Sequence, residues 1–290
     1  MRPVARATAI ALALLFIGVA GSAQEARQET RPHVLPDVRP DVRPEAGSQT
    51  SPQTSPQVQR SGFADMSPAV QAMQRDDAAN PAWLWLEDGR QRFAATCARC
   101  HTAGSMAGVA ARYPAWDEAT RRPFTLGQRI AACHAKPGVG PSGPSGTSPT
   151  PPLGPDSEAR LALETFVAQQ SRGRPIAPPT DARLTPWRER GRALFEQRLG
   201  QLDLACRHCH DQSAGRRLAG SVIPQGHATG YPIYRLEWQG MGSLQRRLRG
   251  CLTGVRAEPF APDSDEMTAL ELYLAQRAAG MPIETPAVRP

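Results

Sequence analysis

The chain has 290 residues, of which 40% are hydrophobic, and 34 Lys and Arg against 27 Asp and Glu give it a formal net charge of +7. This length allows two modest domains and some unstructured sequence. The hydrophobic fraction is low for two packed cores, so an enclosed apolar cofactor in each domain would supply the missing apolar surface. After residue 20 no apolar stretch approaches the roughly 20 residues of a membrane span, so we expect no stable membrane insertion.

The first 23 residues have the pattern of a secretion signal. A positive start and a short apolar run from Ala7 to Ala20 precede Gly21-Ser22-Ala23, which are small residues suited to cleavage before Gln24. We therefore predict a signal peptide over 1–23 and export to the periplasm, with an uncleaved anchor as the alternative. Residues 24–60 are rich in Pro, Gln, Ser and Arg, which predicts a disordered leader.

Two short motifs each hold a pair of cysteines followed by a histidine, Cys97-Ala98-Arg99-Cys100-His101 and Cys206-Arg207-His208-Cys209-His210. This is the c-type haem attachment pattern, in which two thiols bond to the haem and the histidine ligates the iron. A zinc site or a pair of short-loop disulfides is the alternative, although structural zinc needs four ligands and neither half offers an obvious fourth. The predicted attachment cysteines are Cys97, Cys100, Cys206 and Cys209, and the predicted iron ligands in the motifs are His101 and His210.

The positive charge is carried almost entirely by arginine, because Lys136 is the only lysine. The propionates of two haems would bring the folded protein closer to neutrality, so the charge does not predict a nucleic-acid partner. Arginine instead suits the bidentate binding of small oxyanions.

Each motif is preceded by a Gly-Arg pair and a phenylalanine, and is followed by a segment that ends in Pro-Ile. The upstream pieces are Gly89-Arg90 with Phe93 and Gly191-Arg192 with Phe195, and the downstream segments are Leu161 to Ile176 and Thr268 to Ile283. In both downstream segments apolar residues recur at helical spacing. The order of helix, haem motif, loop and terminal helix predicts a class I cytochrome c domain in each half, with its first and last helices crossing beside the haem.

We therefore predict an all-α fold of two class I cytochrome c-like domains in tandem, each around a covalently bound haem, with long irregular loops. The N-terminal domain is expected over 61–178 and the C-terminal domain over 179–290. The low-complexity stretch 137–155 is an insert in the first domain and is expected to form a mobile surface loop. Asp263, with Glu266 three residues later, predicts the start of the last helix.

A second iron ligand is expected in the loop before each terminal helix, where a class I cytochrome usually supplies a methionine. No methionine is well placed there, and Cys133 and Cys251 occupy the loop instead. Their equivalent positions predict a thiolate opposite each motif histidine, and haems of low potential because a thiolate pushes electron density onto iron. The alternatives are a Cys133–Cys251 disulfide, two buried free thiols, ligation by His134 in the first half, or ligation by Met241 in the second.

Arginines are concentrated around Cys251. Three of them lie in the stretch 246–249, and Arg277 lies on the terminal helix that is expected to pack against the same loop. Cys133, by contrast, is preceded by Arg129 alone. An arginine cluster beside a reactive sulfur suits a dianionic sulfur substrate, whereas a haem-propionate contact or a surface charge is the alternative for any one of these arginines.

The segment Cys251-Leu252-Thr253-Gly254-Val255-Arg256-Ala257-Glu258-Pro259 resembles the active-site segment of the SoxA family of di-haem cytochromes. Residues 64–68, 73–77 and 282–286 are also similar to that family, so the resemblance runs from about Phe63 to the C-terminus. The long leader and the low-complexity insert depart from the family pattern without touching these motifs.

The resemblance implies that Cys251 is both an iron ligand and the active-site sulfur, carried as a cysteine persulfide. It implies an L-cysteine S-thiosulfotransferase that couples thiosulfate to a cysteine of a SoxYZ-like sulfur carrier. Two electrons would pass through haem to a SoxX-like mono-haem cytochrome and then to a soluble electron-accepting cytochrome. By the same match Arg247 and Arg277 would hold the anion, and the first haem would be structural or ancestral.

Two other functions are compatible with these residues. A non-catalytic di-haem electron-transfer cytochrome would need no arginine cluster and would tolerate the loss of Cys251. A thiosulfate dehydrogenase that joins two thiosulfates into tetrathionate would need no protein carrier.

Overall fold

The computed structural model describes residues 58–136 and 152–290. The predicted signal peptide, the leader up to residue 57 and residues 137–151 of the predicted insert lie outside this range. Within the two described stretches, no helix combines the length and the apolar character that crossing a membrane requires.

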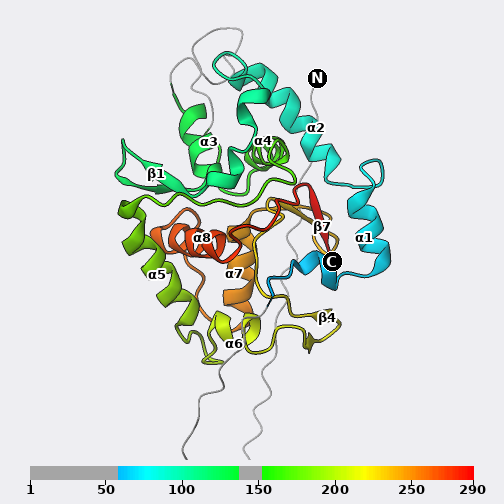
Figure 1. The fold of residues 1–290 in the computed structure, drawn as a ribbon, viewed down its shortest axis with the longest axis vertical. Helices are drawn as coiled ribbons and strands as arrows, with labels where there is room; N and C mark the ends of the chain where they lie inside the picture. Colours follow the sequence, from blue (N-terminus) through cyan, green and yellow to red (C-terminus); the bar gives the residue numbers. More distant parts are fainter. Residues whose placement is uncertain (1–57, 137–151) are drawn as a thin grey trace, which may run out of the picture. The chain divides into compact units, whose positions relative to one another are not determined.

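The two halves repeat one order of elements: a helix, the haem motif, a hairpin, a capped helix and a terminal helix (Figure 1). In the first half these are α2 (Trp83–Arg92), a π-helix (Phe93–Cys97), β1 (Ala115–Asp117), β2 (Arg122–Phe124), α3 (Leu126–His134) and α4 (Glu158–Gln169). In the second half they are α5 (Thr185–Glu196), α6 (Cys206–His210), β3 (Arg217–Leu218), β4 (Ser221–Val222), β5 (Ile233–Arg235), β6 (Gly240–Gly242), α7 (Leu244–Gly254) and α8 (Asp265–Arg277). Outside the repeat, α1 (Pro68–Arg75) comes first and β7 (Ala287–Arg289) comes last.

Side-chain caps fix where three of these helices begin. Thr125 starts α3 and Ser243 starts α7 with the same backbone angles, φ −72° and ψ 166°, and each side-chain oxygen accepts a backbone N–H of the first turn. Ser264 starts α8 in the same way. The prediction that Asp263 starts this helix is therefore wrong by one residue, because the Asp263 side chain forms an ion pair with the first half instead.

The first and last helices of each half cross, as the repeats predict, and each crossing lies at a glycine. A Cβ atom on either glycine would collide with a backbone carbonyl oxygen of the partner helix, so only glycine allows the helices to come this close. The crossing pairs are Gly89 of α2 with Ala162 of α4, and Gly191 of α5 with Ala269 of α8. An aromatic pair packs in each of these two cores, Phe93 with Phe166 (ring centroids 5.0 Å apart) and Phe195 with Tyr273 (5.4 Å apart).

Three small sheets depart from the all-α prediction. β1 pairs with β2 and β3 pairs with β4, both antiparallel, while β5 lies between antiparallel β6 and parallel β7. Each strand has only two or three residues, which is too short for the alternation of polar and apolar residues that reveals a strand in a sequence. In the described residues the helices form the core of each half, while β5, β6 and β7 place Tyr234, Met241 and Val288 in a further buried cluster.

The two halves pack together through equivalent segments. The Pro-Ile ends of the two repeats pair as an antiparallel bridge between Pro175 and Pro282. The Ile176 backbone N–H donates to the Met281 carbonyl at 2.9 Å. The Pro-Ile ends of the internal repeat thus form part of the seam, which is the contact region between the two halves.

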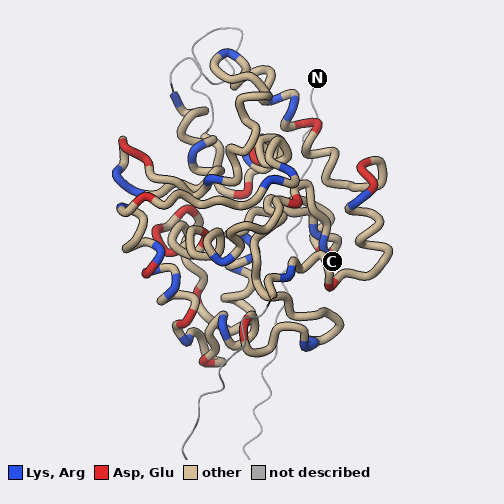
Figure 2. Tube along the Cα trace, viewed as in Figure 1, with Lys and Arg blue, Asp and Glu red and all other residues tan. Residues whose placement is uncertain are grey.

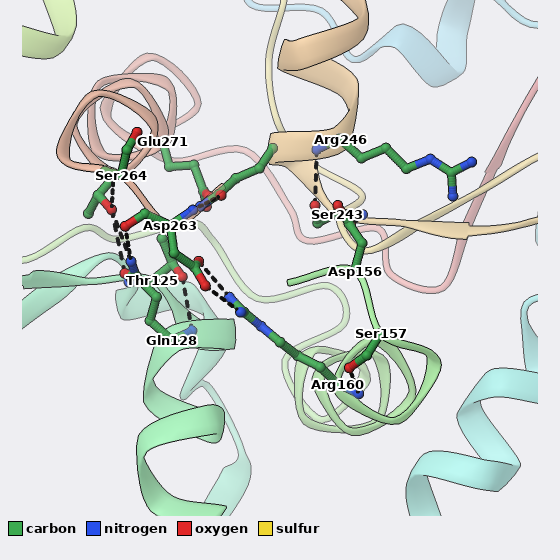
Figure 3. Close-up of polar contacts among 12 residues, drawn as sticks. Thr125, Gln128, Asp156, Ser157, Arg160, Ser243, Arg246, Asp263, Ser264 and Glu271 are labelled. Atoms are coloured by element: carbon green, nitrogen blue, oxygen red, sulfur yellow. Dashed lines mark hydrogen bonds and ion pairs between the residues drawn. The ribbon is translucent and has the colours of Figure 1, made fainter. Parts of the chain in front are cut away.

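An ion pair at this seam links the two halves through side chains (Figure 3). Arg160 extends from α4 and donates two hydrogen bonds, of 2.6 and 2.9 Å, to the Asp263 carboxylate. The Gln128 amide on α3 donates to the Asp263 carbonyl, and the Ser243 backbone N–H at the start of α7 donates to the Asp156 carboxylate. The helices that carry Cys133 and Cys251 are therefore each fixed by a residue of the other half.

The segment before α2 lies on the second half, although it was expected to belong to the first domain. The Asn80 amide donates to the Pro286 carbonyl, and the Gln74 carbonyl oxygen accepts the Val288 backbone N–H of β7 (Figure 1). The Arg60 backbone N–H donates to Gln225. The described segment before α2 and the C-terminal segment thereby meet beside the second haem motif, while the predicted domain boundary at 178/179 stays a prediction.

Candidate functional site

In the second half the haem motif forms α6, the short helix Cys206–His210. His208 caps it, because its Nδ1 accepts the Ala205 backbone N–H at 2.9 Å. Burial, and after it the neighbouring Cys251 sulfur, raises the pKa of Cys206 to about 11. The lone cysteine of α7 therefore lies beside the motif of its own half.

The His210 ring is held in one orientation by the loop that follows the motif. Its Nδ1 lies 2.8 Å from the Pro224 carbonyl oxygen, which can only accept, so Nδ1 carries the proton and donates. Gly226, at φ +74°, packs against the ring so closely that a Cβ atom there would lie 3.1 Å from it. With Nδ1 engaged in this way, Nε2 is the ring nitrogen left for Cys251 or for a metal, and such a second partner is the usual way a protein orients a metal-binding histidine.

Cys251 faces this histidine across the cavity. Burial on its own would raise the pKa of the thiol, but a hydrogen bond with His210 and the positive charges of Arg247 and Arg235 outweigh it and lower the pKa. A lowered pKa favours the thiolate, which is the form that binds metals and attacks electrophiles.

A cavity of about 510 Å³ is lined by Cys206 and His210 of the motif and by the lone cysteine Cys251. Its apolar walls come from α5, α7 and α8, including Phe195, Leu248 and Leu270, and its volume lies within the roughly 300–1,000 Å³ of cofactor pockets. Met66 of the N-terminal segment and Arg289 of β7 also line it. The Cys206 thiol, with Cys209 on the same short helix, an oriented histidine and an opposing thiol at one largely apolar cavity fit a covalently bound haem.

The first half brings Cys97 and Cys133 together in the same way. Burial raises the pKa of Cys97, and the nearby Cys133 sulfur contributes to the rise. Cys100 and His101, however, are exposed to solvent. The residue set for a first haem is therefore complete, but its histidine side is more open than in the second half.

The described structure contradicts one alternative role for the two lone cysteines, and it keeps His134 as an alternative iron ligand. All six cysteines are free and each lone cysteine lies beside its own motif, which contradicts a Cys133–Cys251 disulfide. His134, whose Nδ1 is buried without a hydrogen-bond partner, stays an alternative ligand to Cys133. Met241 is buried among Val70 and Leu161, away from the Cys251 cavity.

Basic and acidic residues are interspersed along the trace, and many arginines form ion pairs (Figure 2). Arg247, one turn before Cys251 on α7, is different: it lines the cavity, and among the described residues its side chain has no hydrogen-bond or ion-pair partner. A cation in this position is available to an anion that enters the cavity.

Arg277, the other predicted anion-binding residue, lies elsewhere. Its guanidinium donates to the Asp211 carboxylate at 2.6 Å and to the Gln225 carbonyl at 3.2 Å, and it stacks 4.5 Å from the Phe195 ring. It is not among the described residues that line the cavity. Its role in anion binding stays a prediction, and it requires the contact with Asp211 to be released or shared.

Sequence reasoning missed two residues of this site, Pro224 and Arg235. Pro224 acts through its backbone carbonyl, which no side-chain pattern reveals. Arg235 lies on β5, sixteen positions before Cys251, and reaches the same cavity through the hairpin. The spacing of equivalent residues in the two halves, taken beyond the helices, contained the signal for Arg235.

Comparison with known proteins agrees with this geometry. The family model described as "SoxA/TsdA, cytochrome c domain" matches twice, over residues 83–176 and 190–283. The L-cysteine S-thiosulfotransferase subunit SoxA of Pseudaminobacter salicylatoxidans is 35% identical over 79% of this chain and 80% of the relative, and that of Rhodovulum sulfidophilum is 34% identical over the same shares. The crystal structure of SoxXA from P. pantotrophus superposes with a TM-score of 0.73 at 31% identity, covering 80% of this chain and 87% of the other. With two cytochrome c domains in tandem, the chain belongs to the SoxA family.

Proposed function

We propose that this protein is an L-cysteine S-thiosulfotransferase subunit that oxidatively couples thiosulfate to a cysteine of a sulfur-carrier protein. The observation that carries the proposal is the position of Cys251, which faces His210 in the second cavity. Beside it lies the Arg247 cation, which has no ion-pair partner in the described part of the chain. The names of the relatives, with 34–35% identity over 79% of the chain, support the same reaction.

We assign one haem c to each half. Cys97 and Cys100 would hold the first, and Cys206 and Cys209 the second. His101 and Cys133 would ligate the iron of the first haem, and His210 and Cys251 that of the second. When bound, haem supplies the one-electron acceptors that carry electrons to a SoxX-like mono-haem partner and then to a soluble cytochrome.

The reaction joins one sulfur atom of thiosulfate to the sulfur atom of the carrier cysteine. A carrier thiol and thiosulfate form one S–S bond, and the thiol proton and two electrons leave. In this chain the Cys251 sulfur, carried as a persulfide, would be joined to the sulfane sulfur of thiosulfate with the loss of two electrons. The carrier thiolate would then take the whole thiosulfate group and leave the persulfide on Cys251, while Arg247 would hold the sulfonate oxygens through charge-assisted hydrogen bonds. Arg277 is the second predicted anion-binding residue.

The proposed surroundings follow the same family. A SoxX-like cytochrome would form a heterodimer with this chain, and a SoxYZ-like carrier would present its cysteine at the cavity. The SoxXA structure supports the first of these partners. Export to the periplasm rests on the signal pattern of residues 1–23, which is a prediction from sequence.

Replacing Cys251 by methionine tests the proposal against a simple electron carrier. Methionine can ligate iron but cannot form a persulfide, so Cys251→Met should keep both haems and lose turnover with thiosulfate and carrier. The matched variant Cys133→Met should change the spectrum of the first haem and keep measurable turnover. Full activity in Cys251→Met would show that the sulfur is only a ligand, and the electron-carrier function would replace the proposal.

A further inference from the structure

In both halves a hairpin and a capped helix precede the lone cysteine, and their residues have the same spacing in the sequence. In the first half, Asp117 ends β1, Arg129 lies on α3, and Cys133 follows Arg129 by four positions. In the second half, Arg235 ends β5, and Arg247 again lies four positions before its cysteine. The residue at the end of the first strand is twelve positions before the arginine in both halves, from 117 to 129 and from 235 to 247.

In the first half this arrangement neutralises the arginine. The Asp117 carboxylate forms an ion pair of 2.7 Å with Arg129 and is itself held by the Thr120 hydroxyl and backbone N–H. The Asp117 side chain is only 7% exposed. The cation beside Cys133 is therefore already satisfied by a buried anion and has little affinity left for another.

In the second half the charge at the same position is reversed. Arg235 replaces the aspartate, and Trp238 stands at the position of Thr120, stacking 5.2 Å from the Arg235 guanidinium. The Arg235 side chain is 14% exposed and lines the cavity together with Arg247. Two cations therefore lie where the first half has a closed ion pair.

One side of Arg235 is already occupied and the other is not. Its Nη2 donates to Glu237 at 2.7 Å, and that carboxylate is 52% exposed. Its Nε, by contrast, is buried and has no hydrogen-bond partner within residues 58–136 and 152–290. A buried cationic donor without an acceptor is costly, and an entering oxyanion would satisfy it.

We propose that Arg235 and Arg247 form a two-arginine oxyanion site beside Cys251, and that Asp117 closes the equivalent position beside Cys133. The inference rests on the proposed function for the identity of the anion as thiosulfate. Trp238 and Glu237 position Arg235, and Arg247 supplies the second donor group. The substitution of one acidic by one basic residue separates a thiolate that accepts sulfur anions from one that does not.

The test uses the haem-loaded protein and compares Arg235→Gln, Arg235→Lys and the control Arg246→Gln. Arg246 is exposed on the same helix as Arg247, stacks on the same Trp238 at 4.2 Å and does not line the cavity as described. Thiosulfate binding is measured by calorimetry without carrier, and KM and kcat are measured with carrier. Haem spectra of all three variants report whether the fold is kept.

Arg235→Gln should weaken thiosulfate binding and raise KM about tenfold or more, because one charge-assisted contact is lost, with a smaller change in kcat. Arg235→Lys should recover part of the binding, and Arg246→Gln should resemble the native protein. Unchanged binding and KM in Arg235→Gln, or an equal loss in Arg246→Gln, would overturn the inference. Thiosulfate binding that depends on Arg235 without any transfer to carrier would contradict the proposed function alone.

Discussion

The two cysteine-bearing helices, α3 and α7, share a fold and differ in charge. Both follow a short hairpin, begin at a hydroxyl cap with the same backbone angles, and bring a cysteine beside the motif of their own half. Around Cys133 the arginine is paired with a buried carboxylate, whereas around Cys251 two arginines line an open cavity. Duplication of the domain thus explains the common geometry, and one strand-end residue explains why the chemistry is expected in one half only.

The halves also differ in how their haem motifs are covered. The first motif exposes Cys100 and His101, while the second cavity receives Met66 from the N-terminal segment and Arg289 from β7. The additional elements outside the repeat therefore gather at the half with the proposed active site.

The largest expected effect comes from substitutions at the helix crossing, a feature that both halves share. Gly89→Ala and Gly191→Ala would each push a Cβ atom into a backbone carbonyl of the crossing helix, which cannot move aside as a side chain would. We expect each to lower the free energy of unfolding by about 3 kcal/mol or more, the upper end for overpacking. Chemical denaturation and haem content measure this effect.

Gly254→Ala is the control for this pair. It lies in α7, where an added Cβ meets nothing within 4 Å, so it should be neutral or slightly stabilising. If Gly191→Ala were as stable as Gly254→Ala, the close helix crossing would not be a requirement of the fold.

The next largest effect is expected at the arginine four positions before each lone cysteine, where the two halves differ. Arg247→Ala should lose about 1.5–3 kcal/mol of anion binding, which is about ten- to a hundredfold in thiosulfate-dependent turnover, with both haems retained. The equivalent change in the first half, Arg129→Ala, should leave turnover within about twofold, because that arginine is paired with Asp117. Equal losses in the two variants would show that the halves do not differ in function.

Arg277→Ala is predicted to lose as much turnover as Arg247→Ala, if it binds the anion. Its ion pair with Asp211 allows another origin for such a loss. Asp211→Asn separates the two, because it removes the ion pair and keeps the cation. A loss in both variants would assign Arg277 to structure rather than to the anion.

The smallest expected effect concerns the seam between the halves. Burial raises the pKa of Glu164 to about 7 and that of Glu271 to about 8, and both line a cavity of about 100 Å³ between the halves. Because both pKa values are raised from 4.5, the folded state binds more protons than the unfolded state between about pH 4.5 and 8. The free energy of unfolding should therefore fall as pH rises through this window.

Glu271→Gln tests this pH dependence. The amide can still accept the hydrogen bond from Gln245, but its NH2 group needs a new partner, so the net gain at pH 8 should be on the order of 1–2 kcal/mol. Near pH 5 the variant should be no more stable than the native chain. Thermal unfolding at both pH values measures the difference, and an equal shift at both would contradict the raised pKa.

The sequence predicted the parts of this molecule that repeat at fixed spacing. The motifs, the repeated Gly-Arg pairs and the terminal helices were visible because haem attachment and helix packing each require particular residues at particular intervals. The hairpins were not visible, since two or three residues carry no period, and neither was the Asp156–Ser243 contact, which links residues far apart in the chain. Asp263 was assigned to a helix start because aspartate suits a cap, whereas tertiary pairing with Arg160 decided its position.

The end of the predicted loop at 137–155 packs against the protein, which its low-complexity sequence did not indicate. Residues 137–151 lie outside the described structure, but Leu153 packs against the first core and Asp156 holds the start of α7. Deleting 138–150 should therefore leave the haem spectra unchanged, whereas a deletion that reaches Leu153 should not.

Mapping the sulfur on each lone cysteine tests the central difference between the halves most directly. The holoprotein is incubated with thiosulfate and oxidant, digested under non-reducing conditions, and the peptides that carry Cys133 and Cys251 are analysed by mass spectrometry. One added sulfur atom on Cys251 and none on Cys133 is the expected result. Equal labelling of both cysteines, or labelling of Cys133 alone, would contradict the assignment of the active site to the second half.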